Sequence, residues 1–185
     1  MAKQFDNIIM RGASGSLGDQ LIFRNSNGRT IISAKKQSNG DRVYSEAQLA
    51  QQQAFRAAII YAQSAKGEEI YRIKANGGPE SPFNVAVADW FKAPEVLGID
   101  LSGWNGGAGG LLRVQARDDV QVKRVIVRFS NTAGGLLEEG QAVHVGDNWW
   151  EYTTRSNLLG AVTVTATAVD LPGNMTELSR EKTIS

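Results

Sequence analysis

The chain changes its hydrophobic period once, near its midpoint. Between Ser45 and Ala65, apolar side chains recur three and four positions apart, which is the spacing of one face of a helix. In the second half, apolar and polar residues alternate, as in Leu112 to Ala116 and Val162 to Ala168. Such alternation is typical of strands with one buried and one solvent-facing side. The pattern therefore predicts helices in the first half and strands in the second.

A β-hairpin is predicted ahead of the helices, from Gln20 to Ala34. Two partly apolar runs flank Asn25-Ser26-Asn27-Gly28, and Asn-Gly supplies the positive φ angles of a tight turn. Upstream, Gly12, Gly15 and Gly18 predict a flexible loop. This series lacks the Gly-Lys-Ser/Thr ending and the flanking elements of a phosphate-binding loop, so backbone bending is the favoured interpretation.

Three helical segments follow the hairpin. Ser45 and Gln48 have the spacing of a capping box at the start of a helix that continues to Ala65. A shorter helical segment covers Glu68 to Lys74, and Ser81-Pro82 starts a third, strongly apolar helix. The alanine-rich face of the first helix either packs on the hairpin, which is favoured, or makes a helix–helix contact in an assembly.

The second half predicts about seven strands, which is the number in a small β-sandwich. They cover residues 96–101, 112–116, 123–129, 135–139, 149–153, 162–168 and 175–184. The expected fold is therefore an α+β N-terminal unit, a β-hairpin plus helices, followed by an all-β immunoglobulin-like sandwich. The expected domains are residues 1–94 and 95–185.

Composition limits the function more than the fold. Twenty basic and nineteen acidic side chains leave a net charge of +1, so no strong field attracts nucleic acid or an anionic membrane. The absence of cysteine excludes disulfides, thiolate nucleophiles and zinc–cysteine sites. The N-terminus lacks a secretory pattern, and no stretch has the length of a membrane helix. We expect cytoplasmic synthesis without a cleaved signal, with incorporation into a particle or export by a non-classical route left open.

Candidate catalytic chemistry is sparse. The single histidine, His144, has no cysteine or second histidine with which to build a usual metal site, and no Gly-x-Ser-x-Gly elbow accompanies it. Glu138 and Glu139 are adjacent and point differently on a strand, which argues against a paired-carboxylate site. We predict that the chain is not an enzyme and has no catalytic residues and no cofactor.

Several acidic and amide residues fall in expected loops. They are Asp118, Asp119, Asp147, Asp170 and Asn174. Calcium takes oxygen ligands from such loops, but Asp and Asn also bond their own backbone in turns, and no Asp-x-Asp-x-Asp-Gly loop is present. Turn formation is the favoured interpretation and no metal site is predicted, with calcium as the alternative.

Aromatic and hairpin residues supply candidates for contact with a partner. Trp149 lies on the opposite face of its strand from Trp150 and Tyr152, so it either stacks on a sugar or protein or is covered by the first half, which is favoured. Basic residues around the hairpin match no groove-reading motif, so nucleic acid is not an expected partner. The candidate contact residues are Phe23, Arg24, Ile31, Phe55 and Trp149.

Three short motifs stand out in the second half: Ala116-Arg117-Asp118, Val122 to Val125, and the turn from Ala168 to Asn174. With these motifs, the last part of the chain resembles the bacterial immunoglobulin-like modules of surface and virion proteins. The resemblance implies a β-sandwich and no single activity.

The first part of the chain carries a Gly-x-x-Gly hairpin, Ser14 to Arg24 and Asn27 to Ile32, and then a Gln/Arg-rich helix from Ser45 to Arg56. It resembles a family of small uncharacterised bacterial proteins, some of them phage-like, which implies a structural role. We expect a subunit of a homo-oligomeric, filamentous or phage-like particle, with itself or other particle subunits as partners. The alternative is a module that binds a carbohydrate or a protein through the sandwich surface.

Overall fold

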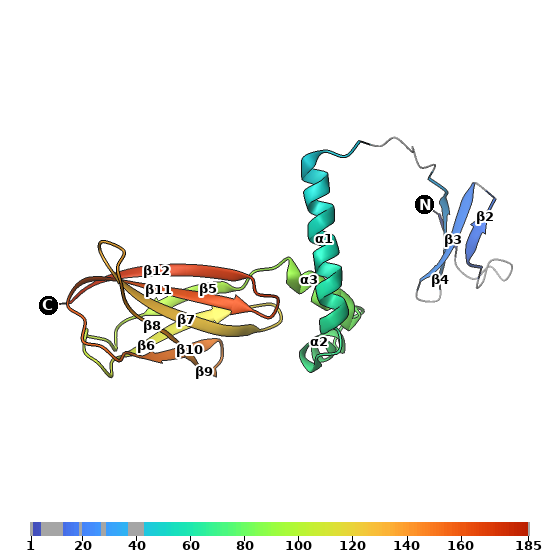
Figure 1. The fold of residues 1–185 in the computed structure, drawn as a ribbon. Coiled ribbons are helices and arrows are strands. Elements are labelled where there is room, and N and C mark those ends of the chain that lie inside the picture. The colour runs from blue at the N-terminus through green and yellow to red at the C-terminus, as the bar shows by residue number, and fades with distance from the viewer. Residues whose placement is uncertain (1, 5–12, 19, 27–28, 37–42, 185) are drawn as a thin grey trace. The chain divides into compact units, whose positions relative to one another are not determined.

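The computed structural model describes residues 2–4, 13–18, 20–26, 29–36 and 43–184, and within them it forms three helices and three β-sheets. By its contacts the chain divides into two compact units, Met1–Glu46 and Ala47–Ser185. The first unit contains one sheet, and the second contains the helices and two sheets (Figure 1). The protein is therefore mixed in class and mostly β.

The first unit is a four-stranded antiparallel sheet in the order β1-β4-β3-β2. Its strands are β1 (Ala2–Gln4), β2 (Gly15–Leu17), β3 (Leu21–Ser26) and β4 (Arg29–Ala34). Strands β3 and β4 form the predicted hairpin, whose Asn27-Gly28 turn lies outside the described residues, as does Gly12.

The glycine-rich segment before the hairpin was expected to be a loop, and for residues 15–17 that expectation is wrong. Gly15 begins β2, which pairs with β3 and places Ser16 opposite Ile22. All three side chains of β2 are exposed, so no alternation of burial marks the strand in the sequence. With β1 and β2 beside it, the hairpin has ladder partners within its own chain, and the sheet's outer strands are only three residues long.

All three predicted helices are present: α1 (Glu46–Ala65), α2 (Glu69–Ala75) and α3 (Pro82–Trp90). Helix α3 begins as predicted, with the Ser81 hydroxyl accepting a hydrogen bond from the Asn84 amide at 3.2 Å and Pro82 in the first turn. Among the described residues, no helix combines the length and apolar character needed to cross a membrane.

Two four-stranded antiparallel sheets make up the rest of the second unit, in the orders β5-β6-β10-β9 and β12-β11-β7-β8. Their strands are β5 (Glu95–Asp100), β6 (Leu111–Arg117), β7 (Val122–Asn131), β8 (Leu136–Gln141), β9 (Val143–Gly146), β10 (Trp149–Thr153), β11 (Gly160–Asp170) and β12 (Met175–Ile184). The seven predicted strands are present, and β9 is an eighth.

The two sheets share one hydrophobic core, as in a β-sandwich. Val127 is fully buried in β7, while Arg128 beside it is exposed and pairs with Glu139. The predicted alternation of faces is therefore confirmed in this strand. Trp150 and Tyr152 also enter the core, and Trp149 on the opposite face is half-buried.

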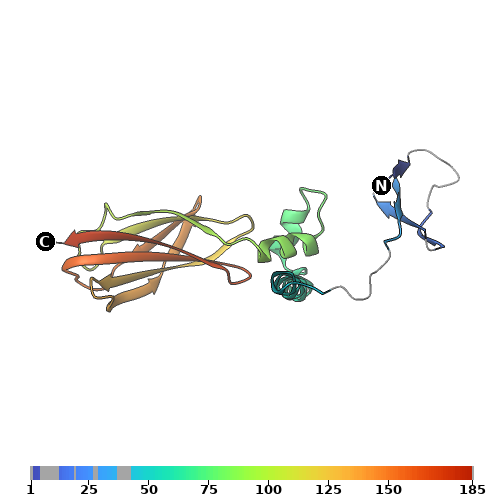
Figure 2. The ribbon, with the colours of Figure 1, turned by 90° about the horizontal axis from the view of Figure 1, so that it is seen from above.

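The helices pack on one end of the sandwich (Figures 1 and 2). Their small core around Tyr71 and Ala86 includes Val120 from the loop after β6 and Leu171 from the turn after β11. The boundary expected between residues 94 and 95 falls inside this second unit, where α3 gives way to β5. Whether residues 95–185 fold without the helices stays a prediction.

Candidate functional site

Helix α1 leaves large apolar side chains uncovered. Leu49, Phe55, Ile59 and Ile60 are between 37% and 73% exposed, whereas the buried residues of α1 are all alanines in its second half. In Figure 1 the N-terminal half of α1 extends past α2 and α3. We call Leu49, Phe55, Ile59 and Ile60 the α1 face. A cluster of exposed apolar side chains on a helix is typical of a protein contact.

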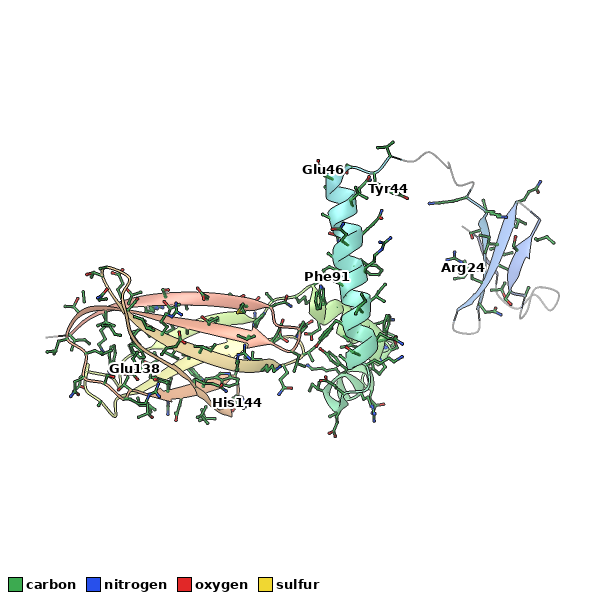
Figure 3. The ribbon with its side chains drawn as sticks, in the orientation of Figure 1. Arg24, Tyr44, Glu46, Phe91, Glu138 and His144 are labelled. Atoms are coloured by element: carbon green, nitrogen blue, oxygen red, sulfur yellow. The ribbon has the colours of Figure 1, made fainter. Side chains whose placement is uncertain are left out.

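Helix α1 has only two charged side chains, Glu46 before the α1 face and Arg56 within its span. Glu46, Leu49, Arg56 and Ile60 follow one another at intervals of three, seven and four residues, so they share one side of the helix. All four are exposed, and Figure 3 labels Glu46 at the N-terminal end of α1. The helix therefore presents one negative and one positive charge with apolar residues between and beyond them.

The five contact residues predicted from the sequence lie on different elements. Arg24 of β3, labelled in Figure 3, pairs with Ile31 of β4 in the sheet of the first unit, and Phe23 precedes Arg24. Phe55 belongs to the α1 face, and Trp149 lies in β10 opposite Gln115. The structure places Arg24 and Ile31 side by side on one face of the hairpin, and Phe23 on the opposite face. Phe55 and Trp149 belong to separate elements of the second unit.

Three aspartates from distant segments meet where the helices join the sandwich. Asp89 comes from α3, Asp118 from the loop after β6, and Asp170 from the end of β11. One carboxylate oxygen of each lies within 4.8 Å of those of the other two. Asp89 and Asp170 are fully buried and Asp118 is half-buried. We call these three residues the acidic cluster.

Two members of the acidic cluster stabilise turns, as the sequence analysis favoured. Asp118 Oδ2 accepts hydrogen bonds from the amides of Val120 and Gln121, both at 2.9 Å. Asp170 Oδ1 accepts from the amides of Gly173 at 2.7 Å and Asn174 at 2.6 Å. The turn interpretation is therefore confirmed for both residues, but it leaves Asp118 Oδ1 buried without a hydrogen-bond partner.

Asp89 is the most constrained member of the cluster. Its Oδ2 accepts a 2.5 Å hydrogen bond from the Tyr71 hydroxyl, which lies 2.7 Å from the Tyr61 hydroxyl. Its Oδ1 is buried and has no hydrogen-bond partner among the described residues. Burial raises the pKa of Asp89 to about 7, and the charges of Asp118 and Asp170 act in the same direction. The pKa of Asp170 is also raised, again mainly by burial.

Asn174 ties the cluster to the end of α3. Its Nδ2 donates to Asp170 Oδ2 at 2.7 Å and to the carbonyl oxygens of Trp90 at 3.2 Å and Lys92 at 3.1 Å. The last carbonyls of a helix have no partner within the helix itself. A side chain of the β11–β12 turn therefore bonds the C-terminal end of α3 and the acidic cluster together.

The other acidic loop residues lie apart from this cluster. Asp119 pairs with Lys92 at 2.8 Å, and Asp147 sits in the tight turn between β9 and β10. Asp147 and Asn148 have φ angles of 47° and 66°, as a two-residue hairpin turn requires. Asp89 was missed in the sequence. Its signal is a single carboxylate in an otherwise apolar helix that was predicted to be covered.

Glu138 and His144, which were weighed for catalysis, have other surroundings (Figure 3). Glu138 accepts hydrogen bonds from the Tyr152 hydroxyl at 2.7 Å and the Arg155 amide at 2.8 Å. Burial acts to raise the pKa of Glu138, but these hydrogen bonds outweigh it and hold the pKa below its usual value. The His144 ring lies against Trp150, with centroids 4.9 Å apart. Neither residue belongs to the acidic cluster.

Comparisons with known proteins do not identify a family. No protein-family model and no curated protein matches the chain. Among solved structures, CopC from Methylosinus trichosporium OB3b is 17% identical, with a TM-score of 0.39, and the match covers 50% of this chain and 93% of CopC. A tetra-tandem repeat from the extending region of a large adhesion protein is 24% identical, with a TM-score of 0.36, over 50% of this chain and 24% of the repeat. TM-scores of this size do not establish a common fold.

Proposed function

We propose that this chain is a non-enzymatic structural protein that assembles with copies of itself, and that the α1 face is the main contact. The observation that supports the proposal is the exposure of four large apolar side chains on one helix. Burying such side chains stabilises an association by roughly 25 cal/mol for each Å² of apolar surface removed from water. A cluster of this kind on a helix is a recurring mode of protein recognition.

A second copy of the chain is the occupant that best fits the charges of α1. If two α1 helices pack antiparallel about Gln51, Glu46 of each copy lies opposite Arg56 of the other. Because a two-fold interface repeats every contact, the two charged residues of one helix then satisfy those of its neighbour. In this register Leu49 lies opposite Gln53 of the other copy. A strongly charged partner would gain little from binding α1, because the helix has one acidic and one basic side chain.

The finer features expected from the sequence remain part of this proposal. The paired antiparallel sheets with a shared core support a sandwich of the immunoglobulin-like kind, facing away from the α1 contact. Phe23, Arg24 and Ile31 serve as a secondary contact within a filamentous or phage-like particle. The short outer strands β1 and β2 limit that contact, because three-residue edges offer few backbone groups for pairing.

Charge exchange on α1 tests the proposal. Sedimentation velocity over a concentration series should show a dimer or larger species for the natural sequence. Arg56→Glu should shift it to monomer, and Glu46→Arg combined with Arg56→Glu should restore association. Lys74→Glu, an exposed charge reversal on α2, is the matched control and should change nothing. A natural chain that stays monomeric at high concentration would overturn the proposal.

One observation favours the second candidate function, binding of a glycan or protein by the sandwich. A surface hollow beside β6, β7, β9 and β10 includes His144, Asn148 and Trp150 in its lining. His144 and Asn148 are exposed beside the buried Trp150 and offer hydrogen-bonding groups to a sugar. Titration with a panel of oligosaccharides, followed by tryptophan fluorescence, tests it. A saturable change that Asn148→Ala removes would support this candidate.

A further inference from the structure

The acidic cluster has no counter-charge of its own. Within the described part of the chain, no lysine or arginine forms an ion pair with Asp89, Asp118 or Asp170, and Lys92, the nearest basic residue in sequence to Asp89, pairs with Asp119 instead. Two of the three carboxylates are fully buried. Buried carboxylates at such close range repel one another when all are ionised. Either a bound cation balances their charge, or one of the carboxyl groups keeps its proton.

Two carboxylate oxygens of the cluster accept no hydrogen bond from the described residues, and such oxygens can serve as ligands of a cation. Asp89 Oδ1 and Asp118 Oδ1 are both buried and have no hydrogen-bond partner among the described residues. Asp170 is the third residue of the cluster, and one carboxylate oxygen from each of the three aspartates lies within 4.8 Å of the other two. Ca²⁺ binds oxygen ligands at about 2.3–2.6 Å, so oxygens up to about 4.8 Å apart can surround one ion, whereas the shorter bonds of Mg²⁺ demand a tighter group.

The cluster is also open to solvent on one side. Asp118 is only half-buried and lines two surface hollows. One hollow also includes Lys92, Glu95 and Arg117 in its lining, and the other includes Gln121. Asp118 is therefore the member of the cluster nearest to solvent, whereas Asp89 and Asp170 are buried behind it.

We propose that Asp89, Asp118 and Asp170 bind one Ca²⁺ ion, and that this ion fastens α3 to the end of the sandwich. The ligands come from three segments: helix α3, the loop after β6, and the end of β11. Asn174 already connects these segments through its hydrogen bonds to the carbonyl oxygens of Trp90 and Lys92. An ion bound by all three segments adds a second connection. Calcium therefore stiffens the connection between the helices and the sandwich.

Isothermal titration of the full, EDTA-treated chain with CaCl₂ tests the proposal. We expect one ion per chain and an increase in the melting temperature on the order of 5 °C at about one hundred times the dissociation constant. Asp89→Asn and Asp118→Asn should each weaken binding by about tenfold or more. The control Asp147→Asn removes a carboxylate outside the cluster and should bind as the natural chain does.

Two results would overturn the inference. One is the absence of both binding heat and a melting shift at millimolar CaCl₂. The other is an equal calcium response in the natural chain and in Asp118→Asn, which would place the ion elsewhere. If Asp89→Asn fails to fold, the half-buried Asp118 supplies the decisive comparison, and terbium luminescence excited through nearby aromatic rings reports the same site independently.

Discussion

Asn174 Nδ2 donates a hydrogen bond to the carbonyl oxygen of Trp90, at 3.2 Å, although the two residues are 84 positions apart. One amide group of a β-turn thereby bonds the last turn of a helix from another part of the chain. The same group reaches Asp170 and Lys92. Through the side chain of Asn174, the acidic cluster and the C-terminal end of α3 therefore belong to one hydrogen-bond network.

Replacing Asn174 by alanine should loosen this network. The carbonyl oxygens of Trp90 and Lys92 lose their donor, and Asp170 loses one of its hydrogen bonds. We expect a loss of about 1–3 kcal/mol in the free energy of unfolding, measured by urea denaturation. Asn84→Ala, an exposed amide on α3, is the control and should stay within about 0.5 kcal/mol of the natural chain. Equal losses would mean that Asn174 contributes no more than a surface amide does.

The raised pKa of Asp89 predicts a distinctive pH dependence. In the folded chain Asp89 has a pKa of about 7, against an ordinary value of 3.8, so between these values the folded state holds a proton that the unfolded state has lost. Stability contributed by this group is therefore lost as the pH rises from about 4 to 7. The difference is on the order of 4 kcal/mol, because the pKa rises from 3.8 to about 7 and each pKa unit corresponds to about 1.4 kcal/mol.

Denaturation in EDTA at several pH values measures this effect. The natural chain should lose stability from pH 5 to pH 8 relative to Asp89→Asn, whose amide does not titrate. Asp118, Asp170, Asp119 and Tyr71 face the same carboxyl and remain in both chains, so the difference isolates Asp89. Parallel pH curves for the two proteins would contradict the assignment.

Val127→Asp should be among the most damaging changes in the sandwich. Val127 is fully buried between the sheets, and an unpaired carboxylate there costs several kcal/mol, which is comparable to the whole stability of a domain. Arg128→Asp, next to it on the exposed face, loses only the ion pair with Glu139, worth up to about 1 kcal/mol. Thermal melts of both variants give the comparison. Similar melting temperatures would show that the faces of β7 are assigned wrongly.

Residues 95–185 should fold cooperatively without the helices. The main hydrophobic core lies within these residues, including the fully buried Val114, Phe129 and Val164. The fragment loses the cover over Val120 and the bonds to α3, so its melting temperature should fall below that of the whole chain. Calorimetry of the fragment tests this. A broad, non-cooperative transition would mean that the helices and the sandwich share one folding unit.

The sequence predicts an element of this structure where buried and exposed side chains recur at the spacing of a helix or a strand. Strand β7 was predictable because its buried and exposed side chains alternate, and α1 was predictable from its spacing and its capping residues. Strands β2 and β9 were missed. β2 has only exposed side chains and no alternating pattern, whereas β9 alternates over Val143-His144-Val145 but is only four residues long and has no buried side chain. A segment whose side chains are all exposed has no repeating pattern of burial from which its secondary structure could be predicted.

The acidic cluster was only half predictable for a related reason. Asp118 and Asp170 belong to turns whose local hydrogen bonds can be inferred from neighbouring residues. Asp89 joins them only because the three helices pack on the end of the sandwich, which is a contact between distant segments. The hydrogen bonds within a turn can be predicted from neighbouring residues, whereas the contact between a helix and two distant loop segments depends on the tertiary fold.

The junction at Asp89 has a consequence for synthesis on the ribosome. The helices emerge before the sandwich, whereas Asn174, which bonds the carbonyl oxygen of Asp89 from 85 positions away, emerges only after most of the sandwich strands. Until then, the apolar side chains of α3 lack the cover of Leu171, and strand β11 has not met β12. Contacts of such sequence separation close late, so the helical core lacks this cover while the residues between Trp90 and Asn174 are translated. Shielding of that surface by a chaperone during elongation is the expected requirement.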